Sequence, residues 1–135
     1  YKNALLEHLH HKGYQIKDLG ADTFDDQDDY PKYAFAAATQ VIGDDDDARA
    51  ILLCGSGEGM AIAANRVRGI RAAVCWNVAV ARETRKDNNS NVLCIPARFL
   101  TQQEAFDVAE AWLEEDFSTN PKYERRLKEI EDIYG

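Results

Sequence analysis

The fold of this chain is decided by residues 50–66, which read AILLCGSGEGMAIAANR. The first five residues form a short, continuously apolar run, the pattern of a strand that is buried on both faces of a parallel sheet. Three glycines follow within the next five residues, and then a run of small residues that favours a closely packed helix. A strand, a glycine turn and a helix in this order predict one βα unit, with the thiol of Cys54 at the end of its strand.

The rest of the chain also alternates between strand-like and helical patterns. We predict further strands at residues 14–20, 70–75 and 92–95, and helices from Tyr1 to a stop at Gly13 and at residues 30–41, 60–66, 78–86, 102–115 and 123–133. This alternation predicts an α/β fold, a doubly wound and mainly parallel sheet flanked by helices in a Rossmann-like three-layer sandwich. No repeat or linker interrupts residues 1–135, so we predict a single domain.

Composition excludes several classes of function. The chain has 135 residues and a net charge of −8, which argues against nucleic-acid binding because phosphate backbones need a basic face. No apolar run approaches the roughly 20 residues that span a bilayer, and no signal peptide opens the sequence. Three cysteines make an odd number, which favours free thiols in a reducing compartment over a disulfide framework. We therefore expect a cytoplasmic protein that binds neither membranes nor nucleic acid.

Two groups of residues raise the alternative of a metal site. Asp44 to Asp47 are four adjacent carboxylates, and His8, His10 and His11 lie on one early helix. The acidic runs at 22–29 and 44–47 are more typical of solvated loops, because adjacent carboxylates repel and point apart. Only two of the histidines share a helical face, and two ligands rarely hold a metal. We expect no metal and no cofactor, which disfavours a metal-dependent hydrolase.

The strongest chemical signal is the thiol of Cys54 beside the glycine turn. Glycines let backbone amides turn toward one point, and a helix start adds unpaired N–H groups and the positive end of its dipole. Such a cradle suits a phosphate or an oxyanion formed during a reaction. Beside it the thiol pKa should be lowered, which predicts a base that is partly thiolate near neutrality. A buried cysteine beside a structural turn is the alternative interpretation.

Two nucleotide-binding motifs fail on spacing. A dinucleotide fingerprint needs glycines at i, i+2 and i+5, but Gly55 and Gly57 are followed by Met60. A Walker A loop needs Gly-Lys-Ser/Thr, which is absent. Nucleotide binding is therefore disfavoured.

Other polar residues stand at predicted strand ends. Because ligands bind outside the carboxyl ends of parallel strands, we expect the site near Cys54, after Cys75 and in the segment before Val92. That segment is the polar run 87–91, DNNSN, for which helix-terminating turn chemistry is the alternative. Further cations that could anchor a phosphate are Arg98, Lys122, Arg125 and Arg126, although cations on a late helix are usually solvated.

In order along the chain, four stretches resemble one family: residues 13–20, 29–34, 51–73 and 85–93, followed by the Arg-rich tail. The family is that of the type B ribose-5-phosphate isomerases and galactose-6-phosphate isomerases. The resemblance covers nearly the whole chain, and residues 54–65, CGSGEGMAIAAN, are its most specific part. It implies a metal-independent aldose–ketose isomerase of a small sugar phosphate in carbohydrate metabolism. Ribose 5-phosphate and ribulose 5-phosphate of the pentose phosphate pathway are the expected pair.

The resemblance also implies roles for individual residues. Cys54 would be the base that moves a proton between carbons 1 and 2, with Ser56 close to the reacting oxygens. Asn88 would reach in from a partner subunit, because sites in this family lie at the interface of a dimer, alone or in a dimer of dimers. Asp87 takes the place of a family histidine that assists ring opening. The substrate-binding residues implied are Tyr30, Gly55, Gly57, Glu58, Gly59, Asn88, Arg98, Lys122 and Arg126, with Lys122 in a position usually filled by arginine.

Three departures from the family pattern bear on function. Family members open with a strand and an Asp-His loop, and this sequence, which starts at Tyr1 inside a helical pattern, contains neither. Either both lie before Tyr1 in a longer chain or the site is incomplete. Asp87 replaces a histidine, and a free carboxyl group titrates near ~3.9, which makes it a poor acid at neutral pH unless burial raises its pKa. Tyr123 replaces another histidine. The alternative function is therefore a catalytically impaired sugar-phosphate-binding protein, or one subunit of a heteromeric isomerase such as galactose-6-phosphate isomerase.

Overall fold

The computed structural model describes residues 2–19, 30–43 and 48–134. Its elements, in order, are α1 (Lys2–His11), α2 (Pro31–Gly43), β1 (Ala50–Cys54), α3 (Glu58–Asn65), β2 (Ala72–Val74), α4 (Val78–Asn88), β3 (Val92–Pro96), the 3₁₀ turn η1 (Ala97–Phe99), α5 (Gln102–Glu114) and α6 (Pro121–Tyr134). The predictions for Tyr1, Gly20 and the acidic runs 22–29 and 44–47 fall outside the described residues.

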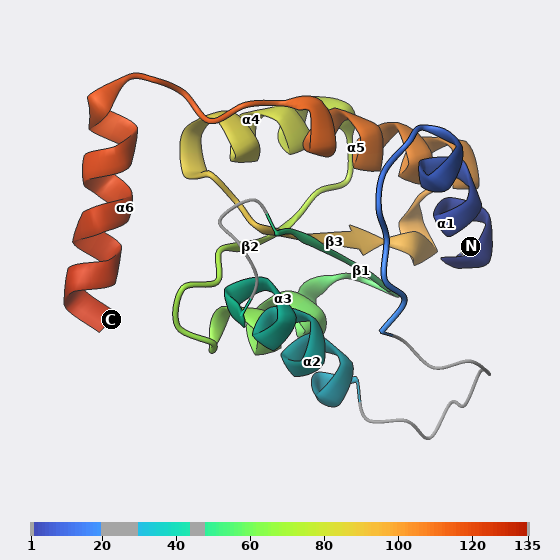
Figure 1. Cartoon of the computed structure of the whole chain (residues 1–135), viewed down its shortest axis with the longest axis horizontal. Helices are drawn as coiled ribbons and strands as arrows, with labels where there is room; N and C mark the ends of the chain where they lie inside the picture. Colours follow the sequence, from blue (N-terminus) through green and yellow to red (C-terminus); the bar gives the residue numbers. More distant parts are fainter. Residues whose placement is uncertain (1, 20–29, 44–47, 135) are drawn as a thin grey trace.

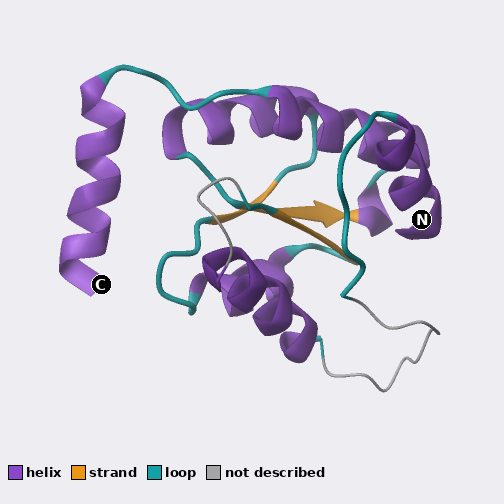
Figure 2. Cartoon of the chain, in the orientation of Figure 1, coloured by secondary structure: helices purple, strands orange, loops and turns teal. Residues whose placement is uncertain are grey.

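The three strands form a parallel sheet in the order β1-β3-β2. In register, Ala50 and Ala72 both lie opposite Val92, so the strands start at one edge and finish at the other. Helices α1, α4 and α5 cover one face, and α2 and α3 cover the other (Figure 1). The layers are clear when helices and strands are coloured separately (Figure 2). The predicted Rossmann-like three-layer sandwich is confirmed.

Strand β3 is the centre of the hydrophobic core. All five of its residues are buried, as a strand with a neighbour on each side and helices on both faces must be. Val92 and Cys94 pack into the cluster formed with α2 and α3. Leu93 and Ile95 pack into the cluster formed with α1 and α5. The period-2 alternation of a strand therefore joins the two helical layers.

The strand predicted at residues 14–20 is wrong, because its described part, residues 14–19, forms no strand. A strand needs a neighbour to hydrogen-bond with, and no strand of the described chain pairs with this segment. The alternation that suggested a strand has another cause. Tyr14 and Ile16 pack against the cluster on one face of the sheet, and Leu19 packs against the cluster on the other.

The other predicted elements are present with shifted ends. Helix α3 begins at Glu58, two residues before the predicted start, and α4 continues through Asn88. Strand β2 is shorter than predicted, at Ala72–Val74. No helix in the described part of the chain is both long enough and apolar enough to cross a lipid bilayer.

Candidate active site

Cys54 ends β1 at the edge where the parallel strands finish, opposite Pro96 of β3. The residue is half-buried, and the backbone N–H groups of Gly57 and Met60 donate hydrogen bonds to its sulfur. Gly57 is the N-cap of α3 and Met60 lies in the first turn, so both donors belong to the helix end that carries partial positive charge. The sulfur therefore meets backbone donors at a strand end that stays partly open to solvent.

Burial raises the pKa of the Cys54 thiol, so the lowered pKa expected from the sequence is wrong. The N–H groups of Gly57 and Met60 and the cation of Arg98 oppose this shift, whereas the carboxylate of Glu58 adds to it. Desolvation outweighs the donors because two amides do not replace all the hydration that a thiolate loses at this partly covered position. Cys54 therefore holds its proton more firmly than a free cysteine does.

The rate at which iodoacetamide alkylates Cys54 should report this pKa, since only the thiolate reacts. We expect the rate to rise with pH through a midpoint above that of a free cysteine. Arg98→Met should move the midpoint to higher pH by removing a cation that favours the thiolate, and Glu58→Gln should move it to lower pH. Cys75 and Cys94 should not compete, because burial raises the pKa of both to about 12. Midpoints that move in the same direction in the two variants would contradict this account.

Gly55 leaves the space in which Arg98 lies. A Cβ atom at Gly55 would stand 2.6 Å from Nη2 of Arg98, so a side chain there would collide with the guanidinium. The backbone N–H of Arg98 also donates to the carbonyl oxygen of Gly55 at 3.0 Å. Arg98 is thus held beside the glycine loop through its own backbone, close enough for its charge to favour the thiolate of Cys54.

Gly57 and Gly59 must be glycine for separate structural reasons. Gly57 has a φ of 82°, in the left-handed region, and a Cβ atom there would lie 3.1 Å from Cγ1 of Val74. At Gly59 a Cβ atom would lie 2.8 Å from the hydroxyl oxygen of Tyr30, so the phenol covers the first turn of α3. The side chain of Arg98 therefore lies against the start of the glycine loop, and that of Tyr30 lies against its end.

Ser56 and Glu58 complete the group, and both side chains are exposed. The hydroxyl oxygen of Ser56 accepts the backbone N–H of Glu58 at 3.3 Å. The N–H of Gly59 has no acceptor within its own helix, as in any first helical turn. The structure brings together eight of the predicted site residues, called here the Cys54 cluster: Tyr30, Cys54, Gly55, Ser56, Gly57, Glu58, Gly59 and Arg98.

Asp87 and Asn88 lie at the opposite edge of the sheet. They form the last turn of α4, which leads into the start of β3, whereas Cys54 lies where the strands finish (Figure 1). The prediction that the segment before Val92 lies at the carboxyl ends of the strands is wrong within one chain, because a segment that precedes a strand meets its amino end. Asp87 is half-buried and Asn88 is exposed.

The other three residues of the polar run support the turn itself. Asn89 ends α4 with a left-handed φ of 48°. The hydroxyl oxygen of Ser90 accepts the indole N–H of Trp112 at 2.8 Å, deep in the core. The side-chain oxygen of Asn91 accepts the backbone N–H of Arg71 at 2.8 Å. Turn chemistry therefore accounts for these three residues.

Lys122 and Arg126 lie on α6, beyond the edge where the strands begin (Figure 1). The two cations flank the ring of Tyr123, with Nζ of Lys122 5.0 Å and the guanidinium carbon of Arg126 5.7 Å from its centroid. Within one chain they are therefore on the far side of the molecule from Cys54.

A family model described as Ribose/Galactose Isomerase matches residues 1–130 of this chain. The chain belongs to the ribose/galactose isomerase family. The resemblance inferred from residues 54–65 and the stretches around them is therefore confirmed.

Named relatives of this ribose/galactose isomerase support the same conclusion. A ribose-5-phosphate isomerase B of Mycolicibacterium paratuberculosis is 39% identical over 126 residues, which cover 93% of this chain and 79% of the relative. A D-erythrulose-4-phosphate isomerase of Pectobacterium atrosepticum is 38% identical, over 92% of this chain and 83% of the relative. The crystal structure of ribose-5-phosphate isomerase B from Mycoplasma genitalium with bound ribulose-5-phosphate superposes with a TM-score of 0.94, at 36% identity, over 98% of this chain and 87% of that one. As a member of this family the chain is an aldose–ketose isomerase, as predicted.

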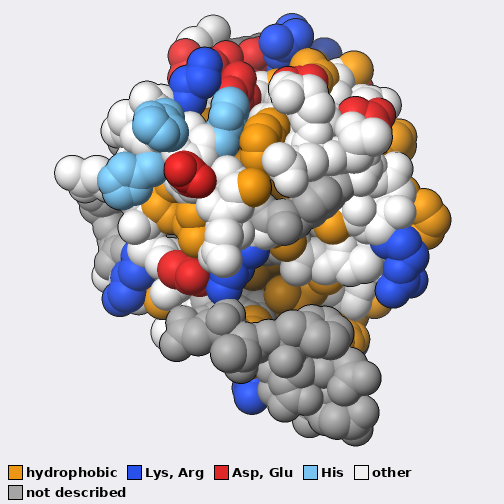
Figure 3. Space-filling view, turned by 90° about the vertical axis from the view of Figure 1, so that its right-hand side faces the viewer, with side chains coloured by type: hydrophobic (Ala, Val, Ile, Leu, Met, Phe, Trp, Pro, Cys, Tyr) orange, Lys and Arg blue, Asp and Glu red, His pale blue; other side chains and the backbone are white. Residues whose placement is uncertain are grey.

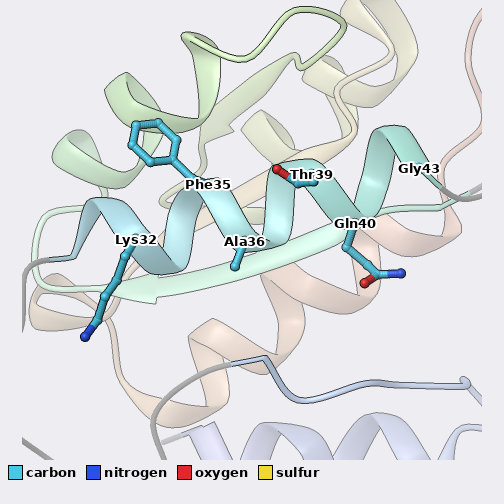
Figure 4. A pocket seen from close by; sticks show the side chains of 6 residues that line it. All are labelled: Lys32, Phe35, Ala36, Thr39, Gln40 and Gly43. Carbon is cyan, nitrogen blue, oxygen red and sulfur yellow. The ribbon is translucent and has the colours of Figure 1, made fainter.

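A hollow of about 470 Å³ lies elsewhere on this isomerase, along α2. All the residues that line it come from that one helix: Lys32, Phe35, Ala36, Thr39, Gln40 and Gly43 (Figure 4). Small-molecule sites are usually enclosed between several elements and have converging polar groups. The hollow includes no member of the Cys54 cluster, so the geometry of that cluster is the better guide to the active site.

The three histidines gather on one face of the isomerase (Figure 3). His8 bonds to Glu110 of α5 through Nε2, and its ring stacks on Phe106 with centroids 4.5 Å apart. His10 and His11 are exposed. Among the described residues, no group of three His, Cys, Asp or Glu side chains is placed to hold a metal ion.

The amide of Met60 was not singled out in advance as a donor to Cys54, although the predicted helix at 60–66 already left its N–H unpaired. The structure starts α3 at Glu58 after a glycine N-cap. An acidic residue directly after a glycine is a common helix start, since its charge complements the dipole. That signal could have placed the N-cap at Gly57, so that the amides of Gly57 and Met60 lie together at the helix start beside the thiol.

Proposed function

We propose that this chain interconverts ribose 5-phosphate and ribulose 5-phosphate without a metal, through an enediolate, with Cys54 as the base. The observation that carries the proposal is the Cys54 cluster, in which a half-open thiol meets two backbone donors and has Arg98 beside the same loop. The similarity to a solved isomerase with bound ribulose-5-phosphate supports the choice of substrate.

The proposed reaction moves one carbon-bound proton. The thiolate of Cys54 removes the proton from C2 of the open-chain aldose, and the electron pair moves onto the oxygen at C1. The N–H groups of loop 55–59 stabilise that oxygen, with the hydroxyl of Ser56 nearby. The thiol then returns the proton to C1, while the proton of the C2 hydroxyl moves to the C1 oxygen, which gives the ketose with a carbonyl at C2 and a hydroxyl at C1. A raised pKa suits the return step, because the thiol keeps the proton near the intermediate until C1 accepts it.

We propose that a second copy of the chain completes the site, in a homodimer or a dimer of dimers. One chain carries Cys54 at the end of β1, and it carries Asp87 and Asn88 on α4 and Lys122 and Arg126 on α6, toward the opposite edge of the sheet (Figure 1). In a two-fold dimer, Asn88 and the α6 cations of one copy can face the Cys54 cluster of the other. Exposed apolar side chains on α6 support such a contact, since Ile130 is 59% and Ile133 is 70% exposed on an otherwise charged helix.

Asp87 favours a second candidate substrate class. A carboxylate is a weaker proton donor near neutrality than the histidine of the family pattern, and ring opening needs a donor. Erythrulose 4-phosphate and its aldose isomer need no ring opening, because the ketose is too short for a five-membered ring and O4, which would close that ring in the aldose, is esterified; one relative is named for the ketose. A catalytically impaired sugar-phosphate-binding protein, or one subunit of a heteromeric isomerase, is the further alternative.

Proton exchange in heavy water tests the function directly. We expect the protein to convert ribose 5-phosphate to ribulose 5-phosphate and to introduce deuterium at C1 or C2, detected by NMR. Erythrulose 4-phosphate and galactose 6-phosphate, measured in parallel, identify the preferred sugar. Binding of ribose 5-phosphate with no deuterium uptake from any of the three would overturn the isomerase and favour a binding protein.

We also propose a cytoplasmic location. All three cysteines are free, and two of them are buried in the core. A reactive thiol base persists best in a reducing compartment, where disulfides do not form readily.

A further inference from the structure

The last turn of α4, which contains Asp87 and Asn88, is held in place by a hydrogen bond from Arg71 to its C-cap residue. Arg71 directly precedes β2 and is partly buried. Its Nε donates to the carbonyl oxygen of Asn89 at 2.9 Å, and its Nη1 donates to the carbonyl oxygen of Gly69 at 3.4 Å. One guanidinium therefore fixes the backbone immediately after Asn88.

The same guanidinium also reaches α6. Nη1 of Arg71 lies 3.9 Å from a carboxylate oxygen of Glu131, on the helix that carries Lys122 and Arg126. Burial lowers the pKa of Arg71 from its usual value, and the charge of Glu131 opposes that shift. Arg71 thus contacts both of the segments that the proposed dimer places in the active site of the other copy.

Asn89 needs such support because of its conformation. Its φ of 48° is uncommon for a residue other than glycine, and it sets the direction in which α4 ends. Its side-chain oxygen accepts a hydrogen bond from Nη1 of Arg85 at 2.9 Å, and its carbonyl oxygen is the group that Arg71 holds. A change in this cap would rotate the last turn, and with it Asp87 and Asn88.

We propose that Arg71 is a positioning residue for the isomerisation, which fixes Asn88 through the Asn89 carbonyl and sets α6 through Glu131. This inference rests on the proposed function, because it assigns Asn88 and the α6 cations to the site of a second copy. Arg71 itself does not touch the substrate. A displacement of about 1 Å in groups that hold a substrate lowers rates by about 100-fold, so loss of Arg71 should be felt at the distant base.

The test compares Arg71→Met with Arg68→Met, a matched change at an exposed arginine three residues earlier. We expect Arg71→Met to lower kcat/KM by about tenfold or more, and Arg68→Met to leave it unchanged. Glu131→Gln removes only the link to α6, so it should raise KM while kcat stays within about twofold. Equal kcat/KM in the Arg71→Met variant and the unmodified protein would overturn the proposal.

A mixing experiment separates positioning from loss of folding. An Arg71→Met chain still has Cys54, and a Cys54→Ala chain still has Arg71, so a mixed dimer contains one site with both intact. We expect activity to return when the two variants are unfolded together and refolded. If Asn88→Ala mixed with Cys54→Ala recovers activity but Arg71→Met does not, the role of Arg71 is wrong. If neither mixture recovers, the shared site itself is wrong. If Arg71→Met does not fold, Arg71→Lys is used in its place in the same mixture.

Discussion

Replacing Cys54 with alanine is expected to lower isomerisation of ribose 5-phosphate by about a thousandfold or more, within the range for loss of a general base. The reason is chemical, since alanine cannot accept the C2 proton and the exposed carboxylate of Glu58 does not take the place of the sulfur that the amides of Gly57 and Met60 meet. The fold should persist, because the residue is only half-buried and ends its strand. Turnover of ribose 5-phosphate measures the loss of isomerisation, and deuterium uptake at its C2 measures the loss of proton removal.

Cys75→Ala is the matched control for this prediction. It removes a fully buried thiol directly after β2, which packs into the cluster with α1 and α5 and not into the cluster on the α3 side of the sheet. We expect it to lower thermal stability slightly, through lost packing, while kcat/KM changes little. A Cys54→Ala protein that still exchanges the C2 proton at the unmodified rate would remove Cys54 from the mechanism.

Mixing two inactive variants is expected to restore activity if the site is shared between copies. Cys54→Ala lacks the base and Asn88→Ala lacks the amide at the far edge of the sheet, so each should be nearly inactive alone. Half of the dimers formed from equal amounts are mixed, and each mixed dimer has one site with both residues intact. Activity should therefore return to about a quarter of that of the unmodified protein, as isologous two-fold pairing requires.

The control mixes Cys54→Ala with Ser56→Ala. In this mixture each variant chain is damaged in its own Cys54 cluster, because Cys54 and Ser56, whose hydroxyl accepts the N–H of Glu58, both belong to that cluster. No mixed dimer then has an intact site, and the activity should stay low. Recovery in this control, or none with Asn88→Ala, would mean that Asn88 does not serve the base of a second copy.

The sequence predicted the βα unit at residues 50–66 because its signals are local. An apolar strand, a glycine turn and a run of small residues each limit the backbone within a few positions, and the structure places β1 and α3 accordingly. The strand predicted at residues 14–20 depended on a partner elsewhere in the chain. Alternation alone does not show whether side chains pack on two sides of a strand or of an extended connection, which is what Tyr14 and Leu19 do.

The grouping of residues around Cys54 was predicted better than the electrostatics of that group. Cys54, Arg98 and Tyr30 lie around one glycine loop. Gly55 leaves the space for Arg98, and Gly59 leaves the space for Tyr30. The direction of the Cys54 pKa shift was wrong, since it depends on a balance between burial and two amides that no motif contains. Arg71 gave no signal in the sequence, because its partners are backbone carbonyls whose direction only the folded turn defines.

The separation of Cys54 from Asn88 on opposite edges of one sheet has a consequence for damaged chains. If a second copy completes the site as proposed, a lesion that removes the thiol of Cys54 would affect the catalytic centre of its own chain. A lesion near the end of α4 would affect the neighbouring copy, which would keep its own thiol and lose only the contacts that the damaged chain supplies. Impaired chains of the two kinds would therefore compensate for each other. Substitutions at either edge of the sheet would be selected for how well they fit a second copy of the same protein.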